Sequence, residues 1–232
     1  MPAVRVRHAV RMRTMGKDTG MNENLAAMVR PLLDWYDVNR RTLPWRGTGD
    51  PYRVLVSEIM LQQTRVAAVI PYYLRWMEEL PDVESLAGVS EERLMKLWQG
   101  LGYYNRARNL QKAARMVVDA FSGRFPEEYE DLLRLPGVGR KTANLILGDV
   151  YGKEGYVCDT HCIRITGLLG ITDGSKDPLK VEKQLRQCIP PEESNNFCHR
   201  MVMHGRAVCA ARKPDCENCT LRPWCSHWAG KQ

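Results

Sequence analysis

The sequence contains no apolar run long enough to cross a bilayer. A membrane helix needs about eighteen or more consecutive apolar residues, and no stretch of this chain approaches that length. The first twenty residues also lack the apolar middle of a secretory signal. We therefore expect an intracellular protein with no membrane partner.

Alternation of apolar and polar residues, the pattern of a half-buried strand, is also missing, and there is no internal repeat or low-complexity segment. Apolar residues recur instead at helical spacing. The pattern predicts helices over about 25–36, 52–63, 66–79, 91–99, 105–121, 128–134, 140–150, 160–169, 178–188 and 194–208. We expect an all-α fold. The 232 residues, 44% of them hydrophobic, could form one domain or two small ones.

The excess of positive charge is modest outside residues 1–20. Residues 1–20 hold five basic side chains and one acid, which leaves +3 of the formal net charge of +7 for the rest of the chain. Such an excess permits nucleic-acid binding without indicating it. The segment 1–20 has no helical apolar stripe, so we expect a disordered basic tail; an arm for targeting or DNA anchoring is the alternative.

Disulfide bonds are not expected from the eight cysteines. The thiols of an intracellular protein are kept reduced, and no secretory signal is present. Cys158, Cys162, Cys188 and Cys198 lie scattered among apolar neighbours. We expect these four to pack as small hydrophobic side chains.

The other four cysteines lie close together near residue 232. Cys209, Cys216, Cys219 and Cys225 are separated by six, two and five residues. Four thiolates clustered in this way can hold a tetrahedral zinc ion or an iron–sulfur cluster, and the spacing suits both. The sequence therefore predicts a metal centre and leaves the metal open.

Turn residues between two predicted helices form the segment LPGVG, residues 135–139. Two glycines separated by one apolar residue permit the tight turn of a helix-hairpin-helix. Free backbone N–H groups at the start of the next helix can bind a phosphate, a contact that reads the DNA backbone and not its sequence. Leu135, Gly137, Val138 and Gly139 are therefore candidate DNA-binding residues.

LPGVGRKTAN, the downstream Asp159 and the four closing cysteines together resemble the endonuclease III and adenine glycosylase superfamily of base excision repair. The resemblance covers about residues 25–228. The first half, with SEIMLQQTRVAAVIPYY and GLGYYNRARNL, looks like the adenine glycosylases, which remove adenine opposite oxidised guanine. The second half, with DTHCIRITGLLG, looks like endonuclease III, and the adenine branch typically lacks a lysine at the position of Lys141.

The resemblance also implies an architecture of two helical lobes with the active site between them. One lobe is a six-helix barrel over 46–151, with the helix-hairpin-helix at 128–150. The other is formed by 21–45 together with 152–232 and carries a [4Fe-4S] cluster on the loop 209–225.

Three residues are the catalytic candidates. A carboxylate can stabilise the positive charge that develops on the sugar, a role that fits Asp159 unless it is only a helix N-cap. Lys141 could attack the sugar carbon, form a Schiff base and permit strand cleavage; an exposed helical lysine is the alternative.

Glu58 lies in the apolar stretch YRVLVSEIML, where an unpaired carboxyl group would tend to keep its proton. The matching glutamate of adenine glycosylases protonates the departing adenine, whereas a solvated or arginine-paired glutamate is the other interpretation.

Flipping a base out of a duplex requires side chains that fill the gap. The candidates are Gln62, Gln63, Tyr103 and Tyr104. Aromatic residues at helical spacing more often belong to a core, but GLGYY follows a glycine-containing break, which favours exposure of at least one tyrosine.

The loop between the first two clustered cysteines contains Arg212 and Lys213. Their basic groups could contact phosphates, and solvated charge beside a metal centre is the alternative. The expected partner is double-stranded DNA that contains a lesion, a mispair or an abasic site. We expect a monomer located in the cytoplasm and associated with the nucleoid.

The expected activity is that of a DNA glycosylase that flips and excises adenine from mispairs such as that with 8-oxoguanine, with an associated AP lyase activity. The alternatives are excision of oxidised pyrimidines with strand cleavage, mismatch-specific removal of thymine, and a non-catalytic DNA-binding module. Adenine glycosylases normally continue into a further domain that reads the oxidised guanine. Because the sequence ends at residue 232, we expect less stringent recognition of the opposite base.

Overall fold

The computed structural model describes residues 28, 31–32, 34–39 and 42–230. The basic tail expected over 1–20 lies outside these residues. The helices of the described part, after helical residues at 31–32 and 34–39, are α2 (Pro51–Leu61), α3 (Val66–Glu79), α4 (Val83–Gly88), α5 (Glu91–Trp98), α6 (Asn105–Phe121), α7 (Tyr129–Arg134), α8 (Arg140–Asp149), α9 (Thr160–Leu169), α10 (Pro178–Cys188), α11 (Ser194–Ala207) and α12 (Ser226–Ala229). Two 3₁₀ turns, η1 (Pro191–Glu193) and η2 (Arg222–Trp224), complete them.

The expected all-α class is confirmed, since the described residues contain no strand. In the same part of the chain, none of the helices combines the length and the apolar character that a bilayer crossing requires. The sequence pattern missed α4, because six residues are too few to show a helical period. This helix starts with a capping box between Asp82 and Ser85 and packs on α6 through buried Val83 and Leu86.

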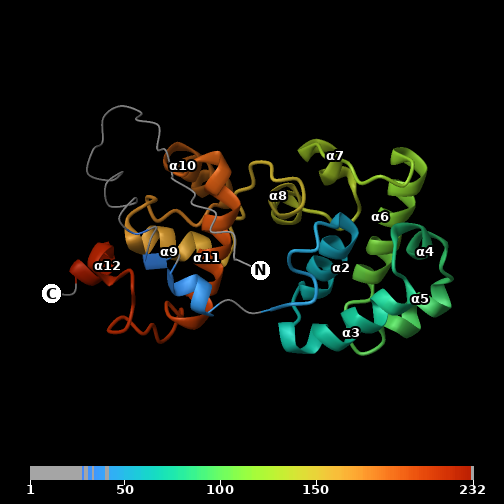
Figure 1. Ribbon diagram of the computed structural model, residues 1–232, viewed down its shortest axis with the longest axis horizontal. Coiled ribbons are helices and arrows are strands. Elements are labelled where there is room, and N and C mark those ends of the chain that lie inside the picture. The colour runs from blue at the N-terminus through green and yellow to red at the C-terminus, as the bar shows by residue number, and fades with distance from the viewer. Residues whose placement is uncertain (1–27, 29–30, 33, 40–41, 231–232) are drawn as a thin grey trace, which may run out of the picture.

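Figure 1 shows the helices in two groups, with α8 between them. Helices α2 to α7 lie on one side, and α9 to α12 lie on the other with the helical residues near 31–39. Helix α8 packs against α2 and α7 of the first group and against α11 of the second. The lobe boundaries expected near residues 46 and 152 remain a prediction.

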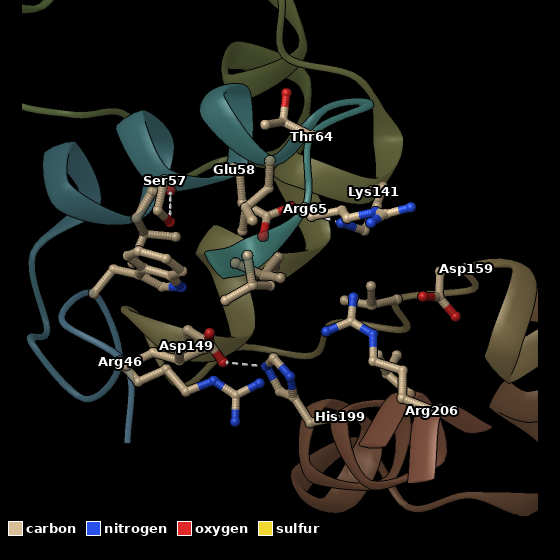
Figure 2. Close-up of a pocket in the computed structure, with 18 of the residues that line it drawn as sticks. Arg46, Ser57, Glu58, Thr64, Arg65, Lys141, Asp149, Asp159, His199 and Arg206 are labelled. Carbon is tan, nitrogen blue, oxygen red and sulfur yellow. Dashed lines mark hydrogen bonds and ion pairs between the residues drawn. The ribbon is translucent and has the colours of Figure 1, made fainter. Parts of the chain in front are cut away.

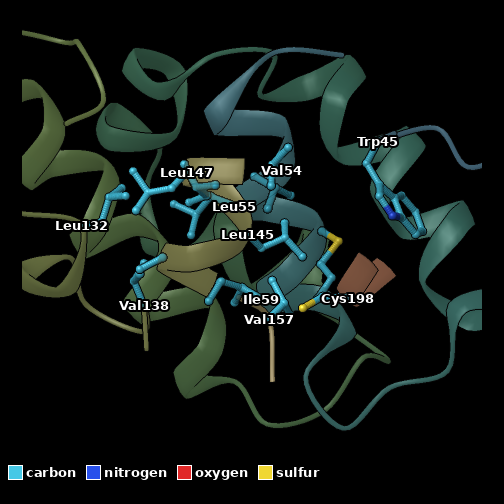
Figure 3. Close-up of a cluster of buried hydrophobic side chains, with 14 of the residues drawn as sticks. Trp45, Val54, Leu55, Ile59, Leu132, Val138, Leu145, Leu147, Val157 and Cys198 are labelled. Carbon is cyan, nitrogen blue, oxygen red and sulfur yellow. The ribbon is translucent and has the colours of Figure 1, made fainter. Parts of the chain in front are cut away.

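Helix α2 is largely buried in the hydrophobic core. Asp50 caps its first turn by accepting hydrogen bonds from the backbone of Tyr52 and Arg53. Apolar side chains then cover most of its circumference, and Figure 3 shows several of them beside α8. The α2 and α8 members labelled there are Val54, Leu55, Ile59, Leu145 and Leu147, which are all less than 8% exposed. A polar side chain on α2 is therefore held in a rigid, largely apolar setting.

Candidate active site

A cavity of about 480 Å³ is walled by residues of both helix groups. Its lining includes Glu58 of α2, Lys141 of α8 and Asp159, the N-cap residue of α9. The structure therefore brings the three catalytic candidates together from positions far apart in the chain (Figure 2). Apolar side chains complete much of the wall, including Val54, Leu61, Leu145, Val157 and Val202.

Glu58 is not the unpaired carboxyl group that its apolar sequence context suggests. Its Oε2 atom lies 2.7 Å from Nζ of Lys141, the second residue of α8. The side chain of Glu58 is only 11% exposed, while that of Lys141 is 51% exposed. Pairing with the lysine offsets the cost of placing a carboxylate among apolar neighbours. The ion-pair partner of Glu58 is therefore Lys141, which follows the hairpin, and not an arginine as the alternative interpretation of the sequence proposed.

Asp159 serves as a helix cap and still presents a free oxygen. Its Oδ1 atom accepts hydrogen bonds from the backbone N–H groups of His161 at 2.9 Å and Cys162 at 2.8 Å. Among the described residues nothing donates to Oδ2. The two interpretations of Asp159 are therefore compatible, because the cap fixes the carboxylate while one oxygen remains available at the cavity.

A second polar group in the cavity was not recognised from the sequence. Asp149, at the end of α8, accepts a hydrogen bond from Asn195 Nδ2 at 2.6 Å, and its Oδ1 lies 2.8 Å from His199 Nε2. Burial raises the pKa of Asp149, but the contacts with His199 and Asn195 outweigh it and hold the pKa below its ordinary value. The nearby charge of Arg46 lowers the pKa further. Asp149 lies 46 positions before Asn195 and 50 before His199, and Arg46 lies about one hundred positions before Asp149, so no contiguous motif joins these elements.

The candidate wedge residues lie on two loops, one after α2 and one before α6. Gln62 ends α2, and its Nε2 atom donates to the carbonyl oxygen of Gly137 at 3.4 Å. Gln63 and Tyr103 have positive φ angles of 57° and 49°, which residues other than glycine seldom adopt. Tyr103 is 64% exposed and Tyr104 is 39% exposed, so both lie at the surface and not in the core.

Arg106 connects these two loops and was also missed from the sequence. Its side chain is buried, and its guanidinium group lies over the rings of Trp98 and Tyr103. The group donates to carbonyl oxygens of both loops, those of Ile59 (3.2 Å), Met60 (2.9 Å), Gln62, Leu101 (2.9 Å) and Gly102 (3.1 Å). One buried side chain thus fixes the backbone of both candidate wedge loops.

The hairpin LPGVG offers only its backbone to a ligand. Leu135 is 1% exposed and Val138 is 7% exposed, so their side chains belong to the core. Gly137 has φ +85°, and Gly139 is the N-cap of α8 without any capping side chain. The first N–H groups of α8 are therefore not occupied by a side-chain cap, as expected for a phosphate-binding hairpin.

Replacing Gly137 with alanine is expected to lower the free energy of unfolding by about 1–3 kcal/mol. The residue has φ +85°, and an added Cβ would lie 3.2 Å from Cβ of Asn109. Gly139→Ala is the matched control, because Gly139 has φ −102° and no atom lies within 4 Å of the added Cβ. Urea unfolding measures both variants, and equal losses of stability would contradict this account of the turn.

The four clustered cysteines are partly exposed free thiols between α11 and α12. Burial raises the pKa of Cys209 and Cys219, Arg164 and the backbone of Leu221 lower it in turn, and neighbouring cysteines of the group raise it again. Within the described ranges, no three His, Cys, Asp or Glu side chains are gathered in metal-ligating geometry. The residues fit a thiolate-bound metal by chemistry and position, and the ligating arrangement itself is not formed.

Arg212 and Lys213 are exposed in the loop between the first two of these cysteines. Neither has an acidic partner among the residues that the structure describes. Both charges are therefore free to meet an external anion.

Comparison with known proteins places the chain among DNA repair proteins. Residues 56–191 match the family described as HhH-GPD superfamily base excision DNA repair protein. The adenine DNA glycosylase of Homo sapiens is 38% identical over 207 residues, covering 84% of this chain and 38% of the relative. That of Buchnera aphidicola subsp. Baizongia pistaciae is 34% identical over 202 residues, covering 85% and 57%. The chain thus spans about half the length of these relatives.

Endonuclease III is similar over more of its own length. The protein of that name from Synechocystis sp. is 39% identical over 180 residues, covering 75% of this chain and 80% of the relative. A solved non-covalent endonuclease III–DNA complex is 29% identical with a TM-score of 0.80, covering 95% and 99% of the two chains. A thermostable thymine-DNA glycosylase is 26% identical with a TM-score of 0.81, covering 91% and 99%. This chain belongs to the HhH-GPD superfamily of base excision DNA repair proteins.

Proposed function

We propose that this protein is a DNA glycosylase that extrudes and excises adenine from mispairs such as that with 8-oxoguanine. The observation that carries the proposal is the convergence of Glu58, Lys141 and Asp159 on one cavity. Glu58 protonates the departing base, which is otherwise a poor leaving group. The free oxygen of Asp159 stabilises the positive charge that develops on the sugar. The relatives named adenine DNA glycosylase support adenine as the base.

An associated AP lyase activity follows from Lys141. Its Nζ atom lies in the same cavity as the two carboxylates, within reach of a sugar placed there. Attack on the sugar carbon gives a Schiff base, from which elimination breaks the DNA strand. The likeness to endonuclease III is consistent with this step.

The partner in this proposal is double-stranded DNA with a mispair, a lesion or an abasic site, bound by a monomer. The uncapped start of α8 binds a phosphate through backbone N–H groups, and Arg212 and Lys213 add basic contacts. The loops of Gln63 and Tyr103 enter the space that the flipped base leaves. None of these contacts except the wedge depends on the identity of a base.

A [4Fe-4S] cluster is the cofactor that we propose for Cys209, Cys216, Cys219 and Cys225. The donor set consists of four thiols, which suits iron–sulfur ligation, and the group is remote from Glu58 and Lys141 in sequence. The cluster would order the loop that carries Arg212. Iron and acid-labile sulfide analysis of purified protein tests the assignment, and a colourless protein that holds zinc would contradict it.

A second candidate is excision of oxidised pyrimidines, which Lys141 favours because a lyase residue is typical of endonuclease III. Removal of mispaired thymine is the third, motivated by the similarity of fold to a thymine-DNA glycosylase. The test uses duplexes that contain adenine opposite 8-oxoguanine, thymine glycol, or thymine opposite guanine, each scored for strand breaks with and without alkali. Adenine release with breaks that need no alkali supports the proposal. Release of thymine glycol alone would favour the second candidate, and no release from any duplex would leave a non-catalytic DNA-binding module.

Lys141→Met is expected to reduce borohydride-trapped adducts on abasic DNA by at least about tenfold, because the amine that forms the Schiff base is gone. Lys153→Met is the matched control, since Lys153 pairs with Glu127 and Glu128 and does not line the cavity. Gel separation of the trapped adduct measures the effect. Undiminished adduct in Lys141→Met would show that another amine is the nucleophile.

A further inference from the structure

The ion pair in the cavity joins two groups whose catalytic roles require opposite changes of protonation. Glu58 Oε2 and Lys141 Nζ lie 2.7 Å apart, as a carboxylate and an ammonium group (Figure 2). A proton donor toward the base needs a protonated Glu58, and a nucleophile needs a neutral Lys141. Transfer of a single proton from the lysine to the glutamate produces both active forms at once.

We infer that Glu58 and Lys141 work as one proton-sharing pair, in which the lysine is the source of the proton that leaves with the base. The inference rests on the proposed glycosylase function and specifies how that site is activated. In the step, a proton of Lys141 passes by way of the Glu58 carboxylate to the departing adenine. The neutral amine attacks C1′ of the sugar, and the C1′–N9 bond breaks with its electron pair going to adenine. Adenine departs neutral, and the positive charge of the ammonium ends on the nitrogen now bonded to C1′.

The difference in burial between the two side chains supports this transfer. Glu58 is 11% exposed and projects from the buried helix α2, so bulk water has poor access to its carboxylate. Lys141 is 51% exposed and can regain a proton from solvent after each turnover. The proton therefore follows a path from solvent to Lys141, then to Glu58, and then to the departing base.

Other charged groups line the cavity from every element around the pair. They are Arg46, Arg65, Asp149, Asp159, His199 and Arg206. Arg46, Arg65 and Arg206 carry positive charge, Asp149 and Asp159 carry negative charge, and His199 lies beside Asp149. Because none of these residues changes in the variants below, the direction of each pH shift reports on Glu58 and Lys141 alone.

The test compares the pH dependence of two reactions under single-turnover conditions. In Lys141→Met, proton sharing predicts that base release loses its proton source. As the pH is raised, the rate of base release then begins to fall in the mildly acidic range. As a fraction of its own maximum, its rate at pH 7.5 is then at least about tenfold below the same fraction for the unaltered protein. A lysine that acted only as a fixed positive neighbour predicts the opposite, because without it Glu58 would hold its proton to higher pH.

Glu58→Gln gives the reciprocal measurement on preformed abasic DNA, which contains no base to protonate. Proton sharing predicts slower strand cleavage near pH 7.5, since the group that accepts the lysine proton is gone. A purely electrostatic pair predicts faster cleavage, since an ammonium without its carboxylate loses its proton more readily. In each of the two reactions, a proton-sharing pair and a purely electrostatic pair predict opposite changes in the pH dependence, so the experiment distinguishes them.

Lys153→Met serves as the control for both reactions and should leave each pH profile unchanged. The readout for each reaction is the rate at pH 7.5 divided by the maximal rate of the same protein across the pH range, so a lower overall rate does not affect it. Unaltered protein that neither releases a base nor cleaves abasic DNA would contradict the proposed function. Unaltered protein active in both reactions, with either variant shifted in the electrostatic direction, would overturn proton sharing alone.

Discussion

Asp159→Asn is expected to slow base release by about 10²–10³-fold, the usual cost of removing a charge-stabilising group from an active site. Asparagine is as good an N-cap as aspartate, and its Oδ1 can accept the same hydrogen bonds from His161 and Cys162. Helix α9 should therefore keep its start and the protein its stability. Single-turnover kinetics on the best duplex measure the rate, and thermal unfolding checks the fold.

The matched control is Asp177→Asn. Asp177 caps α10 in the same way, through a hydrogen bond from the backbone of Leu179, and does not line the cavity. This variant should release the base at the rate of the unaltered protein. Equal rates for Asp159→Asn and Asp177→Asn would show that Asp159 only caps its helix.

Arg106→Lys is expected to lower the free energy of unfolding by about 3 kcal/mol. The planar guanidinium group bonds carbonyl oxygens of two loops and lies over two aromatic rings, which an ammonium group cannot reproduce. Several buried carbonyl groups would lose their donor, including that of Met60. Urea unfolding followed by circular dichroism measures the loss.

The matched control lies two residues further along α6. Arg108 is exposed and pairs with Glu91 on the surface, so Arg108→Lys should change stability by less than about 0.5 kcal/mol. In Arg106→Lys, base release at a temperature where the protein stays folded should also fall, because the wedge loops lose their shared support. Similar stabilities for the two variants would contradict the role assigned to Arg106.

The parts of the site that follow from sequence are those carried by contiguous motifs. LPGVG predicts the hairpin, and the sequence around Asp159 predicts both a helix start and a carboxylate at the site, because each depends on neighbours in the chain. The pairing of Glu58 with Lys141 spans 83 positions and became visible only when α2 and α8 packed together. Asp149 and His199 are a similar case. Neither residue belongs to a recognisable sequence motif, and only the fold brings the two side chains together.

Arg106 was missed for a different reason. In the sequence it is one of several arginines on an amphipathic helix, where a basic residue normally lies in solvent. Its burial depends on unpaired carbonyl groups at two irregular loops, and a sequence pattern does not record where unpaired carbonyl groups will gather.

Helix α8 starts at the hairpin and carries Lys141 as its second residue. In the proposed function, the N–H groups that bind a phosphate and the amine that attacks the sugar are thus parts of one rigid turn. In that function the helix would set the distance along the DNA strand between the bound phosphate and the attacked sugar. Once the phosphate is held, only the nucleotide at a set spacing can present its sugar to the amine. The distance from the bound phosphate would thus determine which nucleotide is cleaved. The cavity would then accept or reject the base of that nucleotide.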